Sequence, residues 1–311
     1  MRPAYSVIFL TTLIGAGQGL FLALFAAQMG ARLGAVESPA ALFLVTGACL
    51  CVALAGLGLL ASFFHLGRPE RAWRSAAMWR TSWLSREVIA LPVFMASVAA
   101  WGFAVHLRSG ATLALGALAL SACLALFVCT AMIYAGVKFL QEWASPWTLA
   151  NFLLIGSASG FMLAVPLCAM LAPALAWAAA ACAVALTLSA LATRLASLAR
   201  NDRLRPKSTP QSAIGMRGPI QQKSQGFTGS SFNTREFFHG ASPGRLRAVR
   251  AAFLQLGFVV PVALVLAGMT TGSFALLAAA AAVQYSGFVV ERWYFLAQAS
   301  HPQNLYYQCA S

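Results

Sequence analysis

A histidine and a glutamate stand at the two ends of one basic, tryptophan-bearing segment, residues 64–86. His65 lies near the start of this segment, and Glu87 follows directly after it. Ionisable groups beside Arg and Trp at the edge of an apolar region suit proton-coupled chemistry on a lipid-soluble substrate. A basic loop that only fixes membrane topology is the alternative. Three arginines of the segment could offset negative charge on a substrate or hold a partner protein: Arg68, Arg71 and Arg74.

A second group of polar side chains follows the fourth apolar segment at four-residue spacing. Tyr134, Lys138 and Glu142 would share one face of a helix that continues through residue 142. The Tyr134 hydroxyl could donate a hydrogen bond to a quinone carbonyl, or Tyr134 is an interfacial tyrosine. Lys138 and Glu142 could instead pair with each other, as opposite charges four residues apart on a helix do.

Eight apolar segments determine the fold class. The 311 residues are 60% hydrophobic and 9% charged, with a mean hydropathy of +0.76. Each segment has roughly the 20 residues that a bilayer core requires. The sequence therefore predicts an all-α integral membrane protein, an eight-transmembrane-helix bundle forming a single domain over residues 1–311. The expected spans are residues 5–29, 40–63, 86–107, 112–135, 148–170, 174–197, 249–270 and 273–291.

The positive charges gather on one side of the expected spans. Both termini and the second, fourth and sixth connections share that side, and only Arg32 and Arg108 of the 21 Lys and Arg residues fall on the other. The positive-inside rule places the basic side in the cytoplasm. The net charge of +14 then reflects topology, anionic lipid and a partner surface, and not nucleic acid.

The second connection is expected to contain a short interfacial helix. Gly67 and Pro69 end the second span, and Pro69 suits the first position of a new helix. Arginine and tryptophan recur after it at helical spacing, which is typical of a helix lying at headgroup depth. Ser85 is expected to cap the third span and to place Glu87 in its first turn.

The sixth connection, residues 198–248, is long and basic and carries exposed aromatic side chains. Its composition alone would leave it disordered, and a segment of this length is usually a linker or a binding loop. Phenylalanines on a basic loop indicate a surface to cover, so we expect a cytoplasmic docking loop. The expected partner-docking residues are Arg235, Glu236, Phe237, Phe238 and His239.

The cysteines and histidines argue against a metal centre held by this chain alone. Six of the seven cysteines lie inside apolar spans, and no CxxC pair occurs. His65 and His106 fall at opposite sides of the membrane, while His239 and His301 lie outside the spans. A haem with two histidine ligands at one membrane depth is therefore not expected. His106 is interpreted as an interfacial residue.

Two groups of motifs resemble a known family. HLGRPERAWR and WRTSWLSREV, followed by MIYA and a downstream Trp and Pro, resemble the membrane anchors of dimethyl-sulfoxide-reductase-type molybdoenzymes, the DmsC family. FNTREFFHG and ERWYFLAQASHPQNLYY are most similar to one branch of it, the membrane subunits of cytoplasm-facing sulfite dehydrogenases. The resemblance covers nearly the whole chain, and the HLGRPxRAWR motif is its most specific part.

The resemblance implies a haem-free, quinone-binding anchor, with ubiquinone or menaquinone as the substrate. It implies two partners, a four-cluster iron–sulfur subunit and a molybdopterin catalytic subunit that carries the molybdenum chemistry. It assigns quinone chemistry to the histidine and glutamate around the second connection, here His65 and Glu87. With Arg68, Arg71, Arg74 and Tyr134 these form the expected quinone-binding residues, and no catalytic or metal-binding residue is expected in this chain.

Several alternatives stay open at the level of sequence. The anchor could oxidise quinol for a DMSO-reductase-type terminal reductase, because a fold does not fix the direction of electron flow. A small-solute transporter is a different class, for which Pro92 and Pro166 could break helices. A purely structural anchor is the third. Gly156 and Gly160 form a small-residue stripe that favours helix packing over ligand binding.

The charge bias makes a prediction about topology. A reporter that is active only in the periplasm, fused after Ser311, should stay silent, because the bias places the fusion point in the cytoplasm. The same reporter inserted after Gly110, in the third connection, is the positive control. Strong activity of the fusion after Ser311 would reverse the docking side and undermine the sulfite branch.

Overall fold

The computed structural model describes residues 3–64, 66–205, 209–220 and 241–301, which form helices and connecting turns without a strand. Eight helices are long and apolar enough to cross a membrane, which confirms the predicted fold class. The spans are α1 (Tyr5–Arg32), α2 (Ala41–Phe63), α3 (Trp83–His106), α4 (Thr112–Ala135), α5 (Pro146–Leu171), η2 with α6 (Pro173–Leu175 and Ala176–Asn201), α9 with η4 and α10 (Pro243–Leu254, Gln255–Val259 and Val260–Thr271) and α11 (Phe274–Ala297).

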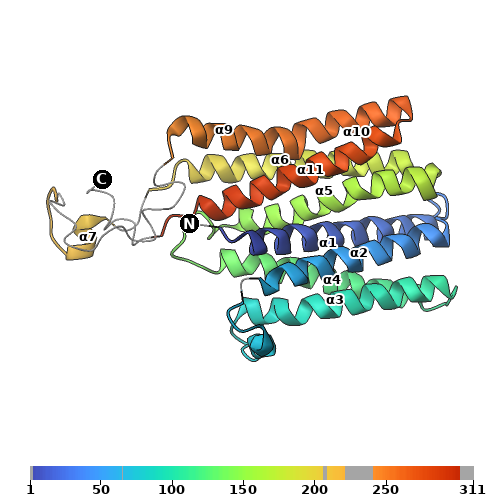
Figure 1. Ribbon diagram of the computed structural model, residues 1–311, viewed down its shortest axis with the longest axis horizontal. Helices are drawn as coiled ribbons and strands as arrows, with labels where there is room; N and C mark the ends of the chain where they lie inside the picture. The colour runs from blue at the N-terminus through green and yellow to red at the C-terminus, as the bar shows by residue number, and fades with distance from the viewer. Residues whose placement is uncertain (1–2, 65, 206–208, 221–240, 302–311) are drawn as a thin grey trace.

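The helices run side by side with α1 and α5 in the middle of the bundle (Figure 1). α2, α3 and α4 lie on one side of this pair, and α6, α9, α10 and α11 on the other. The second connection, with its short helix η1 (Pro69–Ala76), and the short helix α7 (Pro210–Ile214) lie at the same end of the bundle as the start of α1. We call this end, which carries η1 and α7, the basic end.

Glycines bring α1 and α5 into backbone contact. A Cβ atom added to Gly160 would fall on the backbone of Gly19, and one added to Gly19 would fall on the carbonyl of Gly156. No side chain fits between the helices at these positions. Small residues allow membrane helices to approach this closely, because lipid offers no hydrophobic drive for association and packing must supply it. The Gly156 and Gly160 stripe therefore serves helix packing, as the sequence predicted.

The second connection differs from the sequence expectation in detail. Pro69 begins a helix as predicted, but η1 is a 3₁₀ helix and not an α-helix. α3 begins at Trp83, so its cap is Ser82, whose Oγ accepts from the Ser85 amide; the prediction that Ser85 caps was wrong. Glu87 consequently lies in the second turn of α3. Ser85 and Arg86 stand directly before the apolar run, and these polar residues gave no indication in the sequence that α3 begins earlier.

The two prolines that could have broken helices do not do so. Pro92 lies inside α3 and Pro166 inside α5, and both helices continue through them. The broken helices that would have supported the transporter alternative are therefore not found in α3 and α5. The sixth connection is also shorter than predicted, because α6 continues to Asn201 and α9 already begins at Pro243. Asp202 and Arg250 form an ion pair of 2.9 Å between the two helices at this point.

The backbone contact between α1 and α5 predicts that one added methyl group at this contact lowers the stability of the fold. Gly160→Ala should lower the thermal unfolding midpoint of the purified subunit, because overpacking a close contact costs about 1–3 kcal/mol. Gly110→Ala is the matched control, since a Cβ there meets nothing within 4 Å. Midpoints from intrinsic tryptophan fluorescence in detergent test this, and equal midpoints for the two variants would contradict the backbone contact.

Candidate functional site

Glu87 lies in the interior of the bundle and not at its surface. Its side chain is 6% exposed, and the Thr130 hydroxyl of α4 donates a hydrogen bond of 2.5 Å to Oε1. The sequence expectation placed Glu87 in the first turn near headgroup depth. Because α3 begins earlier, at Trp83, Glu87 lies one turn deeper, and its side chain is buried. A buried carboxylate within a membrane span is costly, and such residues usually mark a functional path.

A small internal cavity lies beside Glu87. Its volume is about 20 Å³, which holds one water molecule. Helices α1, α3, α4, α5 and α11 all contribute to its wall, so the cavity sits where the two sides of the bundle meet. The polar side chains that line it are Thr11, Thr12, Gln18, Glu87, Thr130, Ser159, Tyr285 and Arg292.

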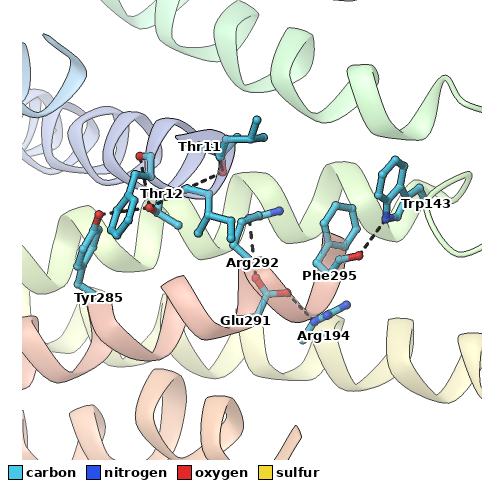
Figure 2. A network of polar contacts seen from close by, with 11 residues as sticks. Thr11, Thr12, Trp143, Arg194, Tyr285, Glu291, Arg292 and Phe295 are labelled. Atoms are coloured by element: carbon cyan, nitrogen blue, oxygen red, sulfur yellow. Dashed lines mark hydrogen bonds and ion pairs between the residues drawn. The ribbon is translucent and has the colours of Figure 1, made fainter. Parts of the chain in front are cut away.

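The cavity wall continues into a buried ionic cluster that the sequence did not lead us to expect. Arg292 lines the cavity, and its Nε lies 3.9 Å from Oε2 of Glu291. Oε1 of Glu291 lies 2.8 Å from Nε of Arg194 on α6, so Glu291 stands between two guanidinium groups (Figure 2). All three side chains are at most 4% exposed. The expected spans hid the cluster, because the last span was taken to end at residue 291, whereas α11 continues to Ala297.

One signal in the sequence could have revealed the cluster. Arg194 falls inside the predicted sixth span, where an arginine must find a partner within the protein. Glu291 is the acidic residue nearest the end of the last span and could have been matched with it.

Five of the buried polar residues occupy one layer near the basic end. At 1.5 Å per residue, Glu87 lies about 6 Å from the start of α3 and Asn151 about 8 Å from the start of α5. Glu291 lies about 9 Å and Arg194 about 10 Å from the ends of their helices, and Thr130 about 8 Å. These helix ends all belong to the basic end (Figure 1). Polar groups from five helices therefore share one depth, roughly a turn and a half inside the bundle.

The three arginines that were predicted to bind quinone lie outside this layer. Arg68, Arg71 and Arg74 are all exposed at the basic end, and Arg74 stacks on the ring of Trp73 at 5.5 Å. Large apolar side chains are exposed beside them around η1 and the start of α3: Phe64, Trp73, Met78, Trp79 and Leu84. His65 and the residues Arg235, Glu236, Phe237, Phe238 and His239 fall outside the described residues.

Tyr134 is a core residue. It is 8% exposed and packs against Trp143, Phe152 and Phe295 with ring centroids 5.2–5.5 Å apart. Trp143 Nε1 donates a hydrogen bond of 2.9 Å to the Phe295 carbonyl, which fixes this aromatic cluster to α11 (Figure 2). Phe152 also lines the internal cavity. The structure thus places Tyr134 behind the cavity wall and not in the interfacial belt.

Lys138 and Glu142 do not share a helix face with Tyr134. α4 ends at Ala135, and residues 136–145 form turns before α5. The four-residue spacing therefore has no helical meaning there, and no ion pair joins Lys138 to Glu142 in the described part of the chain. Partial burial raises the pKa of Glu142, while backbone amides and Arg200 act in the opposite direction.

A second concavity lies at the opposite end of the bundle. This groove between α2 and α3 has a volume of about 480 Å³ and is lined mainly by apolar side chains together with His106. Its lining residues on α3, Ala99 to His106, lie about 18–28 Å along the helix from Glu87. Among the described residues, His106 and Cys49 are the ionisable side chains that line it, so it offers a place for an apolar chain and little for proton chemistry.

The described residues contain no group of three or more His, Cys, Asp or Glu side chains that could hold a metal ion. Residues 1–212 match the family described as DMSO reductase anchor subunit (DmsC). The chain is also 53% identical, over 322 aligned positions, to a subunit of the sulfite dehydrogenase of Allochromatium vinosum, and the alignment covers 99% of each chain.

Proposed function

Because this chain belongs to the DMSO reductase anchor subunit (DmsC) family, we propose that it joins the redox subunits of a molybdopterin oxidoreductase to the quinone pool. The chain itself is a multi-pass membrane anchor with eight spans. The observation that carries the proposal is the polar layer at the basic end, where buried Glu87 and Arg292 line one small cavity. A purely structural anchor has no use for ionisable groups that are costly to bury.

The complex is proposed to oxidise sulfite and reduce quinone. Similarity to a sulfite dehydrogenase subunit over 99% of the chain supports this substrate. The basic end would face the cytoplasm of a bacterial inner membrane, in keeping with the charge bias, and would hold the redox subunits there. The opposite direction, quinol oxidation for a terminal reductase, uses the same fold and remains the second candidate because the family is described by a reductase.

The internal cavity does not fit a quinone ring. A volume of about 20 Å³ holds one water molecule, whereas small-molecule sites usually measure about 300–1,000 Å³. We therefore place the ring outside the cavity, against the exposed apolar side chains around η1 and the start of α3. Glu87 would serve it from the inner side, with His65 and Tyr134 as further hydrogen-bonding groups.

Quinone reduction takes up two electrons and two protons, so the site needs a proton-carrying group in contact with cytoplasmic water. Glu87 can hold one proton on its carboxylate, and the Thr130 hydroxyl fixes the orientation of Oε1. His65 lies on the connection that follows α2 and can exchange a proton with bulk water. Exposed Arg68, Arg71 and Arg74 supply positive charge that attracts electron-rich oxygens or an acidic partner surface.

The remaining redox groups are proposed to lie on partner subunits. A four-cluster iron–sulfur subunit would deliver electrons at the basic end, and a molybdopterin subunit would carry out the substrate chemistry. Haem in this chain is not part of the proposal. The segment Arg235, Glu236, Phe237, Phe238 and His239 would dock the iron–sulfur subunit, because its basic and aromatic residues need a surface to cover.

Loss of the proton carriers should affect quinone turnover alone. In the full complex, Glu87→Gln and His65→Ala should each lower turnover with a quinone analogue at least about tenfold, as removal of a general acid or base does. Sulfite-dependent reduction of an artificial dye at the partner subunits should persist. Glu37→Gln, an exposed carboxylate in the first connection, is the matched control.

Two outcomes would count against this site. Unchanged quinone turnover in both variants of an intact complex would move the site elsewhere, toward Tyr134 and Glu142. Joint loss of assembly, dye activity and quinone activity would instead show that the residues only support the fold.

The docking segment can be tested by deletion. Removing residues 224–240 should release molybdenum and iron from the purified membrane fraction, because a basic, aromatic segment gains order only by covering a partner. This chain should stay in the membrane, as none of the spans is touched. Metal content per mole of this chain measures the effect, and retained metal would make the segment dispensable.

A further inference from the structure

The groove between α2 and α3 has no part in the proposed redox function. It lies at the end of the bundle opposite the basic end, and its volume is about 480 Å³. Binding sites for small molecules usually measure about 300–1,000 Å³, so the groove is large enough to hold a ligand or a substantial part of one. Its shape, its depth and its polar residues together indicate the kind of ligand.

Small side chains form the hollow. Ala48 and Gly102 are buried where the two helices meet, and a Cβ atom added to Gly102 would lie 2.7 Å from Cβ of Ala48. Cys49, Ala53 and Ala99 also line the groove, and all three are exposed. Because α2 and α3 are apolar enough to span a membrane, exposed side chains in these helices face lipid. The groove is therefore open to the bilayer.

The groove reaches only partway across the membrane. At 1.5 Å per residue, its lining residue Ala53 lies about 18 Å from the start of α2, and Ala99 lies about 10 Å from the end of α3. A bilayer core is about 30 Å thick, so the groove has roughly the depth of one leaflet. This depth suits a lipid acyl chain. A membrane-spanning helix of a second copy would need a contact surface along the full thickness.

The outer end of the groove carries hydrogen-bond donors that suit a phosphate group. His106, the last residue of α3, lines the groove and is exposed, and Arg108 is exposed two residues beyond it. An imidazole N–H can donate a hydrogen bond to a phosphate oxygen, and a guanidinium group can donate two in parallel. The other charged residues at this end, Arg32 and Glu37, are opposite in sign, so the end carries a net positive charge.

We propose that this groove is a phospholipid-binding site, in which one acyl chain lies between α2 and α3 and the headgroup phosphate lies against His106 and Arg108. The bound chain would supply the packing contacts that small residues leave unmade between the two helices. A quinone fits less well, because its ring at His106 would lie about 28 Å along α3 from Glu87, at the end opposite the proposed electron entry.

Filling the groove should displace the lipid. Ala99→Phe places a bulky ring at a lining position. Ala100→Phe is the matched control, since it places the same ring on the neighbouring exposed residue, which is not part of the groove lining. The assembled complex is extracted in detergent, and native mass spectrometry counts the phospholipids that remain on it. The wild type and Ala100→Phe should each keep one phospholipid more per copy of this chain than Ala99→Phe.

The headgroup contact can be tested in the same measurement. Replacing His106 and Arg108 together by alanine should lower the fraction of the complex that keeps this phospholipid, because the phosphate loses its hydrogen-bond donors. Arg32→Ala is the control, since Arg32 is an exposed arginine at the same end of the bundle. It should leave the retained fraction unchanged.

A thiol in the groove gives a second measurement, which needs no substitution. Cys49 lines the groove and is exposed, and Cys182 of α6 is an exposed cysteine outside it. Dioleoyl phosphatidylglycerol is added to the delipidated complex in detergent, and the alkylation of both thiols by N-ethylmaleimide is followed. At about ten times the half-protecting lipid concentration, alkylation of Cys49 should slow about tenfold, because only the empty site reacts. The rate for Cys182 should not change.

Each outcome decides for or against the lipid site. Equal phospholipid counts for Ala99→Phe and Ala100→Phe, or unchanged alkylation of Cys49 in added lipid, would overturn it. Protection of Cys49 by decylubiquinone and not by phosphatidylglycerol would assign the groove to quinone, and protection that rises with protein concentration alone would assign it to a second copy. Both results contradict the proposal. If Ala99→Phe fails to fold, the alkylation rates of the unsubstituted protein still decide.

Discussion

Lipid cannot solvate a charge, and this constraint governs the interior of the bundle. Each ionised side chain inside the spans must find its counter-charge within the protein. Arg194 and Glu291 meet at 2.8 Å, and Arg292 lines the cavity of Glu87. The four groups come from α3, α6 and α11, which are far apart in the sequence. The cavity that Glu87 and Arg292 line therefore links the two sides of the bundle that α1 and α5 separate.

The close approach of α1 and α5 makes this link geometrically available. Gly19, Gly156 and Gly160 leave no room for side chains between the two helices. Thr11 and Thr12 of α1 and Phe152 of α5 can then line one cavity with residues of α3, α4 and α11. With larger residues at the crossing, α1 and α5 would be spread apart and the cavity would open beyond the size of a water molecule.

Features that depend on composition could be predicted from the sequence. The depth of a residue in the membrane and the direction of its side chain could not. Eight spans, the start of η1 at Pro69 and the packing role of Gly156 and Gly160 were all accessible from apolar runs and small residues. Span ends were not, because hydropathy falls at Arg86 and Glu291 although the helices continue past them. Glu291 and Arg292 lie at one of these misplaced ends, so the sequence did not reveal their cluster with Arg194. The helical spacing of Tyr134 and Glu142 misled for the opposite reason, since α4 had already ended.

The positions of the polar groups along the membrane normal also favour a single functional site, at the basic end of the bundle. Glu87, Thr130, Asn151, Arg194 and Glu291 all lie within about 6–10 Å of the helix ends at the basic end. The groove at the other end is larger, at about 480 Å³, but His106 and Cys49 are its ionisable lining. The proposed site takes up protons and electrons, and the path for both is shortest when water and the redox partner lie on the same side of the membrane. In the part of the chain that the structure describes, buried carboxylates and exposed arginines come together at the basic end, so proton uptake and electron delivery would meet there.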